Sequence, residues 1–265
     1  WVVLGGGLTG LSAARQLATH FPNEEIVLIE AERVGFGTSG RNSGFALDNF
    51  FQGDEVPFVD PELAKSQMRL CTGGLNLLRK LVKENDIECG WHDWGKLHVS
   101  AGPDGAMGLE GLKKGYEMLD KEIQELNHDE VEAVTGSKFY TAGLKSKGTA
   151  LMNPAALCRG LGDTLPPNVT LYENTPVHRL ERGQQKRLLT TNGEVVTDQL
   201  ILCTNVFSPA LGFAKSDMVP IVAFASLTRP MTALEQVEIS GDSNGFGLLP
   251  TTHGGSERGR YSTRP

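Results

Sequence analysis

Residues Trp1–Glu30 read WVVLGGGLTGLSAARQLATHFPNEEIVLIE, and this stretch decides the fold. Its opening apolar run, Trp1–Leu4, is typical of the end of a buried parallel strand. From Leu8 to Thr19 the apolar residues recur at helical spacing, and Pro22 ends the helix. Ile26–Glu30 is a second strand-like run. The chain is therefore predicted to begin with a strand, a glycine loop, a helix and a second strand.

The glycine loop between the first strand and the helix has the spacing of a dinucleotide-binding turn. Gly5 permits the tight turn, Gly7 permits close approach of the backbone to a pyrophosphate, and Gly10 permits close packing of helix on sheet. The free N–H groups and positive end of the helix face the phosphates. Glu30, about 20 residues beyond Gly10, ends the second strand, where a carboxylate accepts hydrogen bonds from ribose hydroxyls. Because strand, helix and acidic residue are all present, we prefer this reading to a plain glycine-rich turn.

The identity of the dinucleotide depends on Glu30 and on the segment after it. A carboxylate repels a 2′-phosphate, which disfavours NADP, but it does not separate NAD from FAD. An NAD-dependent dehydrogenase would continue with a regular alternation of strands and helices. Residues Gly35–Gly44 read GFGTSGRNSG instead, too rich in glycine and serine for a helix. Backbone N–H groups and small side chains suit close approach to an anionic, planar ligand.

Residues Glu30–Gly44 resemble the second signature of the D-amino-acid-oxidase superfamily of FAD-dependent oxidoreductases, in the form of gamma-glutamylputrescine oxidase-like members. In that family the loop lies along the pyrophosphate and reaches the flavin ring. Weaker resemblances follow at Asn153–Leu157, Asn174–Val177, Leu200–Asn205 and Val219–Ile221. The resemblance implies an FAD site formed by Gly5, Gly7, Leu8, Thr9, Gly10, Glu30, Ala31, Thr38, Ser39, Arg41, Asn42, Ser43, Gly44, Val177, Thr204 and Asn205.

The resemblance implies noncovalent FAD, because the histidine that carries flavin in some members is replaced in the region of Arg41 and Asn42. Those two side chains could orient the flavin or the substrate through hydrogen bonds. Arg260 and Tyr261 could bind a substrate carboxylate if their strand faces the flavin. The implied reaction is oxidation of the C–N bond of an amine or amino acid, by hydride transfer to flavin, giving an imine. An NAD-dependent dehydrogenase, or an inactive FAD-domain fragment acting as a binding module, remains the alternative.

The expected fold is α/β, with a Rossmann-like FAD-binding domain interleaved with an α+β substrate domain that contains a mixed sheet. The FAD-binding domain is expected at residues 1–50 and 151–215, and the substrate domain at residues 51–150 and 216–265. The family's C-terminal glycine-rich loop has no counterpart before Pro265, so we expect a fragment with an incomplete substrate domain. Expected elements include helices at residues 61–83, 107–126 and 153–165, a short helix capped by Asp129, paired strands within 89–100, a hairpin at Asn192-Gly193 and a long strand at 218–230.

Composition and charge argue against several classes of partner, and the small-molecule amine or amino-acid substrate is what the resemblance implies. The formal net charge of the 265-residue chain is −7, which argues against binding to nucleic acid or an anionic membrane surface. No apolar run is long enough for a membrane span. Four widely spaced cysteines without a Cys-x-x-Cys pair favour a reducing compartment, the cytoplasm. The histidines show no ligand spacing, so no metal site is expected. Residues 91–94, WHDW, are interpreted as packing on a half-buried hairpin rather than a substrate wall.

Overall fold

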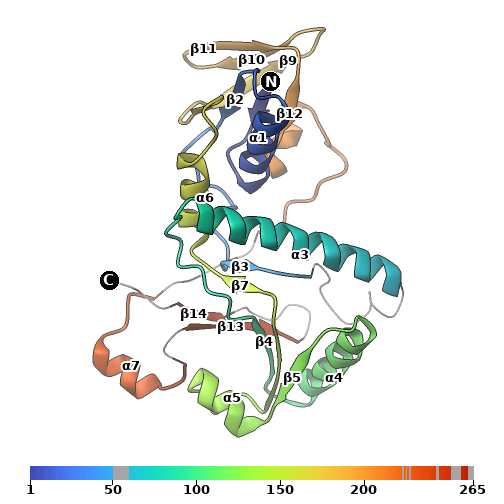
Figure 1. Ribbon diagram of the computed structural model, residues 1–265, viewed down its shortest axis with the longest axis vertical. Coiled ribbons are helices and arrows are strands. Elements are labelled where there is room, and N and C mark those ends of the chain that lie inside the picture. The colour runs from blue at the N-terminus through green and yellow to red at the C-terminus, as the bar shows by residue number, and fades with distance from the viewer. Residues whose placement is uncertain are drawn as a thin grey trace. The chain divides into compact units, whose positions relative to one another are not determined.

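The computed structural model describes residues 1–49, 60–222, 224, 226, 228–242, 245–251 and 258–261, the last four and Pro250 by their backbone alone. The chain forms two compact units (Figure 1). The first unit contains Trp1–Asn42, Leu81–Cys89 and Asn153–Ala225. The second unit contains Ser43–Lys80, Gly90–Met152 and Ser226–Pro265.

A four-stranded parallel sheet forms the centre of the first unit. Its strand order is β12-β1-β2-β8, and the strands span Leu200–Leu202, Val2–Leu4, Ile26–Ile29 and Val169–Tyr172. Strands buried by helices read as continuous apolar runs, which explains the VVL and IVLI segments. Helix α1 (Leu8–His20) follows β1 and buries Leu11, Ala14 and Ala18, the face predicted from the sequence.

A helix, a second sheet and a short 3₁₀ helix belong to the first unit as well. Helix α6 (Pro154–Asp163) begins after Asn153, whose side chain accepts the N–H of Ala156, as an N-cap should. An antiparallel sheet of order β11-β10-β9 spans Gly193–Thr197, Lys186–Thr190 and Val177–Glu181. Its hairpin turns at Thr191 and Asn192, one residue before the predicted Asn192-Gly193 pair, because Gly193 already pairs with Thr190. A short 3₁₀ helix, η1 (Asn205–Leu211), follows β12.

The second unit is built on a mixed five-stranded sheet of order β14-β13-β4-β6-β5. The strands span Arg258–Tyr261, Gly245–Pro250, Lys96–Ser100, Ala142–Ser146 and Ile123–Leu126. Strands β13 and β4 run parallel, and the other pairs run antiparallel. Strands β3 (Phe45–Ala46) and β7 (Ala150–Leu151) form a separate antiparallel pair. The helices are α3 (Pro61–Glu84, its last turn in the first unit), α4 (Pro103–Met118), α5 (His128–Thr135) and α7 (Ala233–Ile239).

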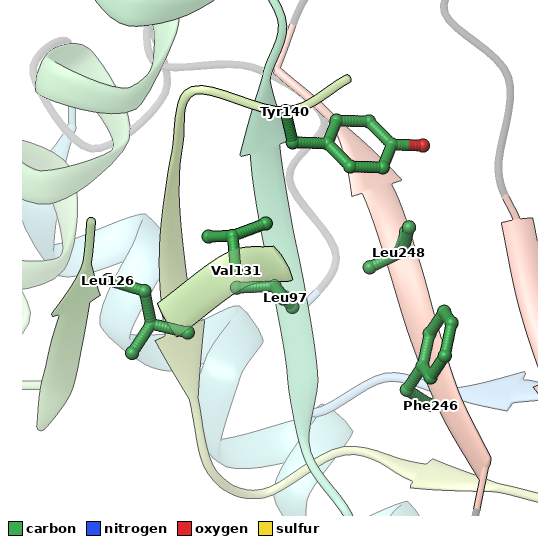
Figure 2. Close-up of a cluster of buried hydrophobic side chains, with 6 residues drawn as sticks. All are labelled: Leu97, Leu126, Val131, Tyr140, Phe246 and Leu248. Carbon is green, nitrogen blue, oxygen red and sulfur yellow. The ribbon is translucent and has the colours of Figure 1, made fainter. Parts of the chain in front are cut away.

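One side of the sheet carries an apolar core. Figure 2 shows Leu97 of β4 and Leu248 of β13 beside Val131 of α5. The whole buried cluster contains Leu97, Leu126, Val131, Tyr140, Phe246 and Leu248. The core therefore links β13 to strands more than a hundred residues earlier in the chain.

Four element predictions are wrong, and in each a tertiary or local contact explains why. Residues 107–126 are not one helix: α4 ends at Met118, and Ile123–Leu126 joins the sheet by pairing with β6. The cap of α5 is Asn127, which forms a capping box with Glu130, rather than Asp129. Within residues 89–100 no hairpin forms, because β4 pairs with β6 and β13 and His92 forms a bridge with Leu151. The described part of residues 218–230 contains no strand, and Ile221 there is 92% exposed.

Candidate functional site

The turn after β1 requires two of its glycines on steric grounds. Gly5 has φ +108°, and a Cβ atom there would lie 2.5 Å from the carbonyl oxygen of Cys203 at the end of β12. A Cβ atom on Gly10 would overlap the carbonyl oxygen of Gly5. The N–H of Gly5 donates to the carbonyl of Ile29 over 2.8 Å, which ties the turn to β2. The glycines thus let the chain pass between two neighbouring strands before α1 starts.

The N-terminus of α1 lies beside a second glycine-rich loop, residues 35–44, called here the second glycine loop. Gly7 is the N-cap residue and has an extended conformation. As a glycine, it has no side chain that could accept an N–H of the first helical turn. The first N–H groups of a helix have no intrahelical acceptor. Here the N–H of Leu8 donates to the hydroxyl of Ser39 over 3.1 Å. A Cβ atom on Gly7 would lie 2.9 Å from the same hydroxyl.

Glu30 ends β2 and holds the glycine loop through its carboxylate. One oxygen accepts the N–H of Gly6 over 2.6 Å, and the other accepts the N–H of Glu32 over 3.0 Å. Because a carboxylate offers about four acceptor positions, capacity remains for the hydroxyls of a ribose. The backbone of residues 174–175 runs beside this corner: Thr175 donates its N–H to the carbonyl of Glu30 and Asn174 to that of Glu32. Val177, two residues later, begins β9, while Ala31 is exposed in the same corner.

The second glycine loop repeats the steric device of the first. A Cβ atom on Gly40 would overlap the carbonyl oxygen of Gly35, in the same way that a Cβ atom on Gly10 would overlap the carbonyl oxygen of Gly5. The amide of Asn42 donates to the carbonyls of Thr38 and Ser39, over 3.1 and 2.9 Å. The guanidinium of Arg41 lies 4.1 Å from the ring centre of Phe36. In the structure, therefore, the Asn42 amide braces the loop and Arg41 stacks on a neighbouring ring.

The end of β12 contributes the last predicted residues of the first unit. The N–H of Cys203 donates to the carbonyl of Leu4, which continues the parallel pairing with β1. The hydroxyl of Thr204 lies 2.8 Å from that of Ser208, and Asn205 opens η1 with φ +46°. Thr204, Gly5 and Glu30 thus follow three adjacent strands at their carboxyl ends, the edge where open parallel sheets bind ligands.

Four predicted residues belong to the second unit. Gly44 has φ +71°, and its carbonyl accepts the N–H of Met152 over 2.9 Å, while Ser43 precedes it. Arg260 and Tyr261 lie on β14, where they pair with Phe246 and Gly245 of β13. The side chains of Arg260 and Tyr261 lie outside the described part of the chain.

A buried ionic cluster in the second unit was missed by the sequence interpretation. The side chain of Lys96 is 1% exposed and contacts one carboxylate oxygen of Asp48. The side chain of Lys121 contacts the other oxygen of the same carboxylate. Tyr116 lies beside the cluster, and burial raises the pKa of its hydroxyl to about 12. The lysine that begins the strand KLHVS is the local signal for this cluster, since its partners come from distant segments.

The described residues bear on three other kinds of feature: a metal site, a reactive thiol and a membrane-spanning helix. They contain no cluster of His, Cys, Asp or Glu that could hold a metal ion. Burial raises the pKa of Cys158 to about 11 and raises that of Cys203, which suits small apolar side chains rather than nucleophiles. Within the described chain, no helix is long and apolar enough to cross a membrane.

Comparison with known proteins gives the family. A family model described as "DAO: FAD dependent oxidoreductase" matches residues 1–260. Gamma-glutamylputrescine oxidoreductase of Escherichia coli (strain K12) is 26% identical over 211 residues, which cover 77% of this chain and 48% of that protein. The protein of Rhizobium meliloti (strain 1021) described as "Probable oxidoreductase OrdL" is 27% identical over 252 residues, 91% of this chain and 57% of its own length.

The solved structures support the same fold. Glycine oxidase from Geobacillus kaustophilus superposes with a TM-score of 0.63 at 18% identity, covering 80% of this chain and 56% of that one. L-proline dehydrogenase from P. horikoshii also gives 0.63, at 17% identity, covering 79% of this chain and 54% of that one. The chain spans about half the length of the curated relatives it matches. The predicted α/β fold and FAD cofactor are confirmed, and the chain belongs to the DAO family of FAD-dependent oxidoreductases.

Proposed function

We propose that this chain binds FAD noncovalently through its two glycine loops, and that the protein oxidises the C–N bond of an amine or amino acid. The observation that carries the proposal is the convergence of three features at the carboxyl edge of the parallel sheet. They are the N-terminus of α1, the Glu30 carboxylate and the Ser39 hydroxyl. A helix N-terminus favours a phosphate, and a carboxylate at the next strand end favours a ribose.

The residues present fit the cofactor. The glycines of the first loop leave the backbone beside the N-terminus of α1 without side chains of its own, as the close approach of a pyrophosphate requires. Glu30 would accept ribose hydroxyls, with Ala31 and Val177 beside the adenine. The remaining proposed contacts come from the loops and the end of β12: Gly5, Gly7, Leu8, Thr9, Gly10, Thr38, Ser39, Arg41, Asn42, Ser43, Gly44, Thr204 and Asn205.

Bound FAD would supply the oxidising chemistry, accepting a hydride from the carbon that bears nitrogen and leaving an imine. The chain's own residues would orient the cofactor and the substrate. Asn42 would keep the second loop in one conformation through its hydrogen bonds to Thr38 and Ser39. Arg260 and Tyr261 would bind a substrate carboxylate. Two of the similar proteins, gamma-glutamylputrescine oxidoreductase and glycine oxidase, are named for an amine derivative and an amino acid, which supports this substrate class.

We further propose that residues 1–50 and 151–215 form the FAD-binding domain and that residues 51–150 and 216–265 belong to the substrate domain.

The described cysteines are free thiols, which supports a reducing compartment, the cytoplasm. Fractionation of cells that express the natural protein tests the location. Recovery with the membrane or secreted fraction would contradict it.

The test of the proposed function is bound flavin. The purified full-length protein should be yellow, with an absorbance band near ~450 nm, a property of the cofactor. Gly7→Leu should abolish FAD binding while the protein remains folded, because Gly7 is in extended conformation and only the Ser39 hydroxyl lies close to its Cβ direction. Gly73→Leu is the matched control, since the space around Gly73 is open. Colourless protein that does not bind added FAD would overturn the proposal.

The substrate needs a separate experiment. Peroxide release should be screened over primary amines, D- and L-amino acids and N-methyl amino acids, with an artificial electron acceptor in parallel. Turnover of at least one of these classes is expected. An FAD-loaded protein that is reduced by none of them would contradict the substrate class and leave the cofactor proposal intact.

A further inference from the structure

The buried cluster in the second unit places two ammonium groups on one carboxylate. The Nζ atom of Lys96 lies 3.0 Å from one oxygen of Asp48, and Lys121 contacts the other oxygen. The hydroxyl of Thr149 donates to the first oxygen over 3.1 Å. The side chains of Lys96, Asp48 and Lys121 are only 1%, 8% and 9% exposed. The three charges are therefore removed from bulk water and fixed by mutual contact.

Such a cluster is a poor device for stability alone. Burial by itself would raise the pKa of Asp48, but the charges of Lys96 and Lys121 outweigh it and hold the pKa below its ordinary value. Burial lowers the pKa of Lys121, and the charge of Lys96 lowers it further. Removing ions from water costs several kcal/mol per ion, and apolar side chains of similar size are often at least as stabilising. The Asp48 side chain is nonetheless held by three contacts, from Lys96, Lys121 and Thr149.

The backbone that carries Asp48 belongs to the segment that leads directly out of the second glycine loop. Phe45 and Ala46 pair with Leu151 and Ala150, and Gly44 accepts a hydrogen bond from Met152. The side chain of Asn49 is a further acceptor for Lys96. A Cβ atom on Gly148 would overlap the Asp48 carboxylate, so the carboxylate is enclosed on that side as well.

We propose that Asp48 is a positioning residue for the FAD loop: its clamp by Lys96 and Lys121 fixes Ser43 and Gly44, the end of the loop nearest the clamp. The inference rests on the proposed function, in which Ser43 and Gly44 contact FAD. Only four positions separate Gly44 from Asp48, and both belong to the second unit. The strand pairing orients the segment, and the ionic clamp stops it from sliding along its neighbour.

The test compares two variants of the full-length protein with similar losses of stability. Asp48→Asn alone leaves two buried ammonium groups without a carboxylate and can fail to fold. The main variant is therefore Asp48→Asn with Lys96→Met and Lys121→Met, which removes all three buried charges and leaves no ammonium group without a carboxylate. Val131→Ala is the matched control, since Val131 is fully buried in the apolar core of the same unit. Amide hydrogen exchange of residues 43–49 is measured without FAD, and the FAD dissociation constant and visible circular dichroism are measured with it.

The clamp variant should show faster exchange at residues 43–49, an FAD dissociation constant raised about tenfold or more and altered flavin dichroism. Val131→Ala, compared at the same thermal stability, should change neither the exchange at residues 43–49 nor the FAD dissociation constant nor the flavin dichroism. The positioning role is overturned if wild type and clamp variant bind FAD equally and give the same dichroism. It is also overturned if the control loses affinity to the same extent. A wild-type protein that binds no FAD overturns the proposed function itself, an outcome separate from these.

Discussion

The hydroxyl oxygen of Ser39 lies 3.1 Å from the backbone nitrogen of Leu8 and accepts its N–H. This hydrogen bond joins the second glycine loop to the first turn of α1, across 31 positions of sequence. It places a small polar group at the end of the helix where a phosphate is favoured. The two glycine loops, which the sequence presents as separate motifs, are therefore parts of one structure.

Ser39→Ala tests that relationship. The substitution leaves the Leu8 N–H without its acceptor and removes one proposed contact to the pyrophosphate. We expect a loss of about 0.5–1.5 kcal/mol in the free energy of unfolding and weaker FAD binding. Urea denaturation and titration calorimetry measure the two quantities. Ser12→Ala, at an exposed position of α1, is the control, and equal FAD affinity in both variants would contradict the proposed role of Ser39.

Glu30→Gln tests the corner of the site at the end of β2. The two carboxylate oxygens accept N–H groups of Gly6 and Glu32, but a glutamine offers one acceptor oxygen and turns a donor toward the other N–H. We expect a cost of about 1–3 kcal/mol in stability, together with loss of FAD affinity. Glu24→Gln, on an exposed turn, controls for the change in net charge. A glutamine variant that folds and binds FAD like the wild type would show that this carboxylate is dispensable.

Gly10→Ala and Gly73→Ala separate close packing from helix propensity. Both glycines are helical, but a Cβ atom on Gly10 would overlap the carbonyl of Gly5, whereas Gly73 has open space around it. Thermal denaturation should show a loss of about 1–3 kcal/mol or more for Gly10→Ala, as for overpacked sites. Gly73→Ala should gain roughly 0.5–1 kcal/mol, because alanine is the better helix former. Two variants of equal stability would argue against the tight turn at Gly5.

Acid should destabilise the second unit through Asp48. The folded-state pKa of this group lies below its ordinary value, so its contribution to stability is present above the unfolded pKa of about 3.9. That contribution is lost as the pH falls through the folded value, when the two lysines lose their counter-charge. Urea midpoints measured from pH 6 down to about pH 3 should fall less steeply in the variant Asp48→Asn with Lys96→Met and Lys121→Met. If the urea midpoint of the variant falls with pH as steeply as that of the wild type, Asp48 is not the source of the acid destabilisation.

Local sequence rules predicted the elements whose signals lie within a few residues. The glycine spacing with Glu30 and the cap Asn153 before Pro154 each determine their own backbone geometry, and both form as expected, while the predicted hairpin turns one residue early, at Thr191-Asn192. The family resemblance also began in one continuous loop, Glu30–Gly44. These features were predictable because their steric and hydrogen-bonding causes are local.

Errors arose where the deciding partner lies far along the chain. Ile123–Leu126 has helical spacing with the residues before it, yet it forms a strand because β6 offers its backbone groups about twenty residues later. Lys96 lies at the start of β4, and its burial is offset by the oxygens of Asp48 and Asn49, which come from a segment about fifty residues earlier. The sequence by itself determined the glycine turns, the Asn153 cap and the cofactor class, because these follow from residues close together in the chain. Only the tertiary structure decided that Ser39 meets Leu8 and that two lysines enclose Asp48, because hydrogen bonds and ion pairs depend on distances that chain separation does not reveal.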